Sequence, residues 1–148
     1  MQNNHISKIT TYQAGTVQAY VNRLLQKQCD EILAPFGISK MQWMIIGNIL
    51  DAGKNGIRVS DLVDILGTTM PYLTTNINLL QSKGYLQRLE NLEDSRSKLI
   101  SINPSFVKQC HKMETALREG LRTSIYAKID PEEFQTYIKV MYQLKSVE

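Results

Sequence analysis

A helical face of short hydrogen-bonding side chains is the feature of this sequence that suggests binding chemistry. Hydroxyl and amide groups recur there at helical spacing, on Tyr72, Thr74, Thr75, Asn78 and Gln81. The opposite face is apolar and carries Met70, Leu73, Ile77 and Leu80. A solvated helix face usually carries Lys and Glu, and this one has neither. Thr and Asn can hydrogen-bond phosphates or base edges, and Asn can bond adenine at two points.

A polar loop follows, with Arg96 close to Asp94. An arginine on a mobile loop can enter the narrow, electronegative minor groove of DNA, and Asp94 would hold that side chain at the required angle. The alternative is a solvated loop with a local ion pair worth little. Arg88, at the end of the preceding strand, either reaches a phosphate or faces water.

The elements that position these residues read as helix, turn, helix and hairpin. We expect helices at 60–66 and 70–83 joined by 67–69, strands at 85–89 and 98–102, and a minor strand at 58–59. Ser60 is the expected N-cap of the first helix, and Thr68 or Thr69 that of the second, with Pro71 in its first turn. This order predicts a winged helix-turn-helix. The helix pair alone is equally compatible with a helical hairpin in a core.

Long helices flank this module. One is expected from Ser7 to Leu33, and a capping box at 39–42 starts a core helix that runs to Ala52. Two more are expected, from 104 to about 127 and from 131 to 144. Their apolar stripes exceed what a small winged domain can cover, which predicts a homodimer. The fold class is mainly α (α+β), with a dimerisation helix in 1–36, a DNA-binding domain in 37–103 and dimerisation helices in 104–148.

Composition and sequence pattern argue against a membrane-spanning protein, a secreted protein and an enzyme. Net charge is +3 over 148 residues, and residues 57–102 carry five Lys/Arg against five Asp/Glu. Phosphate contacts must therefore come from a few placed cations and neutral donors. The chain has no run of roughly 20 apolar residues and no signal-peptide pattern, so we expect a cytoplasmic protein. Cys29 and Cys110 are expected to be free thiols. We find no metal-ligand, cofactor or catalytic pattern, and an enzyme is not expected.

The run from Asp61 to Arg88, followed by Asp94-Ser95-Arg96 and the strand at 98–102, resembles the MarR (multiple antibiotic resistance regulator) family. The D-x-R of the wing is the hallmark, and GISKMQWMIIGNIL is similar to the helix after the family's N-terminal arm. The family often has Thr-Arg in the recognition helix where this chain has Thr74-Thr75. Base reading then rests on Thr75, Tyr72 and Asn78, or affinity depends more on the wing. Lys98 replaces a small apolar residue and could add a phosphate contact.

The resemblance implies a transcriptional regulator, more often a repressor, that binds a pseudo-palindromic operator as a homodimer. Such proteins are modulated by a small aromatic or phenolic effector, or by oxidants. The candidate effector residues are Tyr12, Tyr20, Trp43 and Met44, although aromatic residues at such positions are more often core. Cys29 has acidic neighbours and is a poor redox sensor. The alternative is a winged-helix protein-interaction module without sequence-specific DNA binding. The candidate DNA-binding residues are Ser60, Thr69, Pro71, Tyr72, Thr74, Thr75, Asn78, Arg88, Asp94, Ser95, Arg96 and Lys98.

Overall fold

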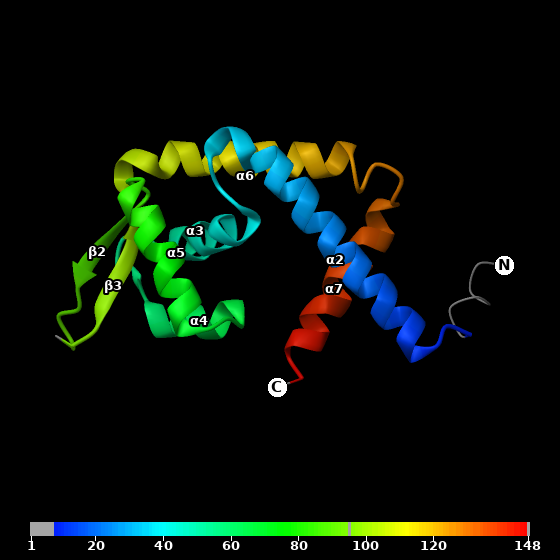
Figure 1. Ribbon diagram of the computed structural model, residues 1–148, viewed down its shortest axis with the longest axis horizontal. Coiled ribbons are helices and arrows are strands. Elements are labelled where there is room, and N and C mark those ends of the chain that lie inside the picture. The colour runs from blue at the N-terminus through cyan, green and yellow to red at the C-terminus, as the bar shows by residue number, and fades with distance from the viewer. Residues whose placement is uncertain (1–7, 95, 148) are drawn as a thin grey trace.

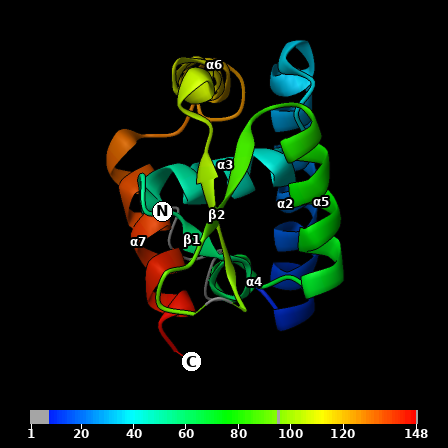
Figure 2. The ribbon, with the colours of Figure 1, turned by 90° about the vertical axis from the view of Figure 1, so that its left-hand side faces the viewer.

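The computed structural model describes residues 8–94 and 96–147. A winged domain lies at one end of the molecule, helices α2 and α7 extend away from it at the other end, and α6 runs between the two ends (Figure 1); the second view shows α2 and α7 on opposite sides (Figure 2). The elements are α2 (Thr11–Leu33), η1 (Ala34–Phe36), α3 (Lys40–Ala52), β1 (Ile57–Arg58), α4 (Val59–Leu66), α5 (Met70–Ser82), β2 (Leu86–Glu90), β3 (Lys98–Ile102), η2 (Pro104–Phe106), α6 (Val107–Thr123) and α7 (Pro131–Lys145). The winged helix-turn-helix prediction is confirmed.

Helix α3 forms the centre of the winged domain. The predicted capping box is present: Ser39 Oγ accepts a hydrogen bond from the Gln42 amide, and Gln42 Oε1 accepts one from the Ser39 amide, both at 3.1 Å. Ile45, Ile46 and Ile49 are fully buried. They pack in one cluster with residues of α4, α5, the sheet and α6.

The sheet has three antiparallel strands in the order β1-β3-β2. The minor strand spans Ile57–Arg58, one residue earlier than expected. The first wing strand begins at Leu86 instead of Tyr85, because the Tyr85 amide donates to the Leu80 carbonyl at the end of α5. The Tyr85 ring packs on Phe106 with ring centroids 4.7 Å apart.

Two local expectations in the helix-turn-helix are wrong. Ser60 does not cap α4, because the chain turns from β1 directly into the helix and Arg58 occupies the N-cap position. Met70 is 44% exposed instead of buried. It is the first residue of α5, directly after the Thr69 cap, and lies outside the core contact.

The helices outside the winged domain are only partly covered. Only Cys29 and Leu33 are buried in α2, and residues 11–20 are all exposed. Helix α2 begins at Thr11, and Ser7 lies outside the described residues. Helix α6 ends at Thr123, earlier than expected, and the chain then turns, with the Tyr126 amide donating to the Leu121 carbonyl. In the described part of the chain, no helix is both long and apolar enough to cross a membrane.

Candidate nucleic-acid interface

Helix α5, which carries the predicted polar side chains, runs beside the sheet (Figure 2). Thr69 caps it, with Oγ1 accepting from the Tyr72 amide at 3.4 Å, and Pro71 lies in its first turn. Leu73, Ile77 and Leu80 are buried and anchor the helix. Tyr72, Thr75 and Asn78 are exposed, whereas Thr74 is half-buried. The Thr75 hydroxyl donates to the Pro71 carbonyl, which leaves its methyl group and oxygen lone pairs for a ligand.

A buried amide that sequence reasoning missed fixes the inner face of α5. Asn76 is 8% exposed. Its Nδ2 donates to the Tyr72 carbonyl at 3.0 Å, and its Oδ1 accepts from Gln42 Nε2 of α3 at 3.5 Å. A polar residue among the apolar positions Leu73, Ile77 and Leu80 was the available signal. Asn76 therefore ties the helix to α3.

Arg88 of β2 lies against α5. The sequence suggested either a phosphate contact or a solvent-facing side chain, and neither interpretation anticipated this position. Its Nε donates to Gln81 Oε1 at 2.9 Å, and one terminal nitrogen donates to Asn78 Oδ1 at 2.7 Å. A guanidinium has five N–H donors, so others remain for a ligand. The strand thus supplies a cation to a helix that carries no charged residue of its own.

The wing tip is shaped by side chains that bond its backbone. Asp94 Oδ1 accepts from the Arg96 amide at 3.0 Å, and Asn91 Oδ1 accepts from the Glu93 amide at 3.1 Å. Asp94 was expected to orient the Arg96 side chain, and its observed contact is with the backbone instead. The Arg96 side chain is exposed, and Ser95 lies outside the described residues. Lys98 Nζ pairs with Glu90 across the hairpin at 3.3 Å, so any phosphate competes with that carboxylate.

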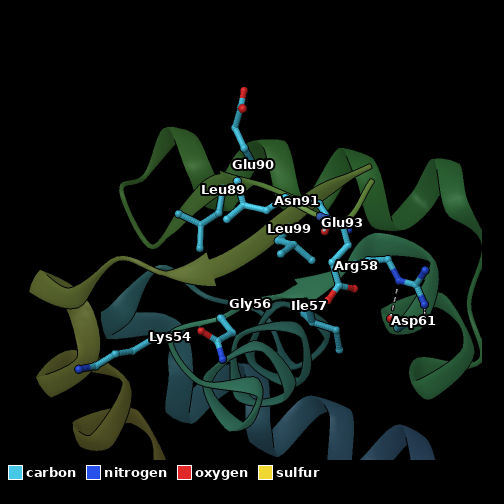
Figure 3. Close-up of a pocket in the computed structure, with 12 residues that line it drawn as sticks. Lys54, Gly56, Ile57, Arg58, Asp61, Leu89, Glu90, Asn91, Glu93 and Leu99 are labelled. Atoms are coloured by element: carbon cyan, nitrogen blue, oxygen red, sulfur yellow. Dashed lines mark hydrogen bonds and ion pairs between the residues drawn. The ribbon is translucent and has the colours of Figure 1, made fainter. Parts of the chain in front are cut away.

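A shallow pocket of about 670 Å³ lies beneath the wing, between β2, β3 and the start of α4 (Figure 3). Arg58 on its rim is paired with Asp61 at 3.1 Å, whereas Lys54 lies at the far end and Glu90 points away from the other lining residues (Figure 3). Charges of both signs surround the pocket. Among the described residues, Arg58 and Lys98 are paired with carboxylates, whereas Arg88 and Arg96 form no ion pair.

A mostly apolar cavity lies where the flanking helices meet the winged domain. It measures about 710 Å³ and is lined from α2, α3, α6 and α7. Two of the four candidate effector residues, Trp43 and Met44, line it. Tyr12 and Tyr20 do not, because they lie in the exposed N-terminal part of α2. Sequence reasoning missed the other lining residues, which come from distant elements: Cys29, Lys40, Glu114, Leu117, Arg118, Leu121, Arg122, Tyr126, Ile129, Pro131 and Phe134.

Both cysteines are buried free thiols. Burial raises the pKa of the Cys29 thiol; Lys40 partly opposes this shift and Asp30 adds to it. Burial also raises the pKa of Cys110. A raised pKa leaves little nucleophilic thiolate near neutral pH. Among residues 8–94 and 96–147, no three His, Cys, Asp or Glu side chains are grouped as metal ligands.

Comparisons with known proteins agree with this geometry. Residues 36–97 match the family model described as MarR family. The chain is 27% identical over 81 residues to the HTH-type transcriptional regulator PrsX of Escherichia coli, covering 55% of this chain and 49% of PrsX. It is 28% identical over 101 residues to the multiple antibiotic resistance protein MarR of Salmonella typhimurium, covering 66% and 69%. This chain thus spans about half the length of PrsX and about two thirds of that MarR.

Among solved structures, a mutant E. coli MarR complexed with operator DNA superposes with a TM-score of 0.79. The identity is 22%, and the alignment covers 88% of this chain and 91% of that one. The structural match extends over the flanking helices as well as the winged domain. Residues 36–97 are thus similar to the MarR family, and 88% of the chain shares the fold of the solved MarR structure.

Proposed function

We propose that this protein is a transcriptional regulator, acting as a repressor, that binds a pseudo-palindromic operator as a homodimer. The single observation that carries the proposal is the outer face of α5. It is exposed, free of acidic residues and rich in hydroxyl and amide groups, and the wing stands beside it. Its 13 residues extend about 20 Å, and a helix is about 10–12 Å across with its side chains, so it can lie in the major groove, which is roughly 12 Å wide.

The wing is the second contact. Arg96 is exposed on a tip that Asp94 and Asn91 hold by backbone hydrogen bonds. An ordered tip lowers the entropy lost when an arginine enters the minor groove. Thr69, Pro71, Tyr72, Thr74 and Thr75 contribute from the start of α5. Ser60, in the first turn of α4, is positioned to contact a phosphate with its hydroxyl or backbone amide.

Dimerisation is inferred from the flanking helices. Val17 and Tyr20 of α2 are 62% and 61% exposed, and Tyr142 and Leu144 of α7 are 71% and 61% exposed. Exposed apolar side chains on these two helices favour burial against a second copy. Two-fold symmetry would place two copies of α5 about one DNA turn apart, roughly 10 bp. Operator binding would require the protein to be cytoplasmic.

The test is a binding titration on duplexes selected from a random pool, repeated at several salt concentrations with non-specific competitor. We expect a palindromic consensus and an affinity that falls steeply with salt. Retention of all duplexes with equal affinity, or of none, would contradict the proposal. It would instead favour a protein-interaction module of the same fold.

The apolar cavity is the proposed effector site. Its volume of about 710 Å³ suits a small ligand. Three cations contribute to its lining. Arg118 pairs with Glu114 at 3.0 Å and Arg122 pairs with Glu119 at 2.7 Å, which leaves Lys40 as the lining cation without an ion pair among the described residues. This charge balance favours an aromatic or phenolic acid over a neutral ligand. Because α2, α3, α6 and α7 all border the cavity, an occupant would change the angle between the dimer helices and α5.

The effector proposal can be tested with Trp43, the single tryptophan of the chain. Benzoate should change its fluorescence in a saturable manner and lower the affinity for operator DNA, whereas benzyl alcohol should bind more weakly. Equal affinities for benzoate and benzyl alcohol would show that the cations of the cavity lining do not contribute to binding. No saturable change with either ligand would contradict a site at Trp43.

A further inference from the structure

We infer that Arg88 is a positioning residue of the DNA-reading surface: it turns the amides of Asn78 and Gln81 so that their NH₂ groups, not their oxygens, meet the bases. The inference rests on the proposed DNA-binding function and adds the base preference. Its basis is the pair of hydrogen bonds from Arg88 to Gln81 Oε1 at 2.9 Å and to Asn78 Oδ1 at 2.7 Å.

The frame around these contacts is rigid. Asn78 and Gln81 are three residues apart on α5, hence on one helix face, and both are exposed. Strand β2 follows α5 after a turn closed by two backbone bonds, from Gly84 to the Gln81 carbonyl and from Tyr85 to the Leu80 carbonyl. Arg88 is then paired in register with Ile100, which is fully buried. The backbone of Arg88 is therefore held at a set distance from the helix, and its two hydrogen bonds place the guanidinium against α5.

The orientation of the two amides follows from hydrogen-bonding chemistry. A primary amide can rotate to exchange its accepting oxygen and its donating nitrogen. A guanidinium only donates, so an amide nitrogen turned toward Arg88 would face another donor. Both oxygens must therefore point to Arg88, and both NH₂ groups point away from it. Without Arg88, either rotamer would be available to Asn78.

This orientation determines which bases the side chains of α5 can hydrogen-bond. Recognition of adenine by Asn requires the amide oxygen to accept from N6 while the nitrogen donates to N7. The oxygen of Asn78 is turned toward Arg88, so the adenine contact expected from the sequence is disfavoured. Guanine presents two neighbouring acceptors, O6 and N7, in the major groove. The NH₂ groups of Asn78 and Gln81 match guanine, and they compensate for the absence of an arginine at Thr74 and Thr75.

Parallel selections from a random duplex pool would test this, using the parent protein, Arg88→Lys and Asn78→Asp. Arg58→Lys, which alters another exposed strand arginine with a side-chain partner, is the matched control. The parent and the control should select guanine at the same position of each half-site. Arg88→Lys keeps the charge but lacks the planar fork, so its preference for guanine over adenine should fall roughly tenfold. Asn78→Asp still accepts from Arg88 but offers no donor, so it should select cytosine there.

Several results would overturn the inference. One is a parent that selects adenine at this position. Another is an Arg88→Lys variant that loses affinity uniformly while keeping the parent's consensus, because that describes a phosphate contact. A parent that selects no consensus would instead refute the proposed function itself.

A measurement without DNA keeps the inference independent of operator binding. The side-chain NH₂ signal of Asn78 should show restricted motion in the parent by ¹⁵N relaxation and free motion in Arg88→Lys. If the Asn78 NH₂ group moves freely in the parent protein while the parent still selects a palindromic consensus, the proposed DNA-binding function holds and the positioning role of Arg88 is refuted. Thermal unfolding of each variant confirms that the fold is retained.

Discussion

Replacing Val17 by Ser tests whether the exposed stripe of α2 forms the dimer interface. Val17 is 62% exposed, on the same side of α2 as Tyr20. Burying a whole valine side chain is worth about 1.5–3 kcal/mol, so the exposed part offers about 1–2 kcal/mol. A two-fold symmetric dimer buries Val17 of both subunits, so the contribution to dimer stability is about 2–4 kcal/mol. The dimer dissociation constant should therefore rise roughly 30- to 900-fold.

Sedimentation equilibrium over a wide concentration range measures that constant directly. Serine has nearly the helix propensity of valine, so α2 itself should persist and circular dichroism should not change. Ile65→Ser in α4 is the matched control, because Ile65 is 42% exposed but lies in the winged domain. A Val17→Ser constant equal to that of the control would refute the interface, and so would a parent that stays monomeric throughout.

Three further outcomes are expected. Arg96→Ala should weaken operator binding and reduce the slope of log affinity against log salt by about one per wing, while sedimentation still reports the parental dimer; an unchanged slope would exclude a wing contact. Gly56→Ala should lower the free energy of unfolding in urea by at least about 2 kcal/mol, since φ is +75° and a Cβ would lie 2.8 Å from the Ile100 carbonyl oxygen. Gly15→Ala, with open space around it in α2, should instead raise it by about 0.5–1 kcal/mol. The raised pKa values of Cys29 and Cys110 favour the neutral thiols in the folded state. The stability that these thiols contribute is therefore complete below the ordinary pKa of 9.0 and is lost as pH rises through the pKa values of the folded state. Alkylation by iodoacetamide near pH 7 should be slower than for free cysteine, and equal rates would contradict the burial.

The corrections to the sequence interpretation have a common origin. Helix starts were predicted well where a cap bonds within its own turn, as at Ser39 and at Asp130, whose carboxylate accepts from two amides. Ser60 has the composition of a cap, but pairing of β1 with β3 sets where α4 begins. Asp94 was correctly assigned to the wing, but its partner is a backbone amide. Residue type limits the possible contacts of a side chain, and packing selects among them.

The elements of this chain, their order and the polar face of α5 could all be read from the sequence, because periodicity and capping involve residues within a few positions of one another. Only the tertiary structure decided which distant groups meet. Arg88 reaches Asn78 across 10 residues and Gln42 reaches Asn76 across 34. The apolar cavity likewise joins Trp43 to α6 and α7. No local pattern encodes these contacts, since each depends on how the sheet and the helices pack around α3.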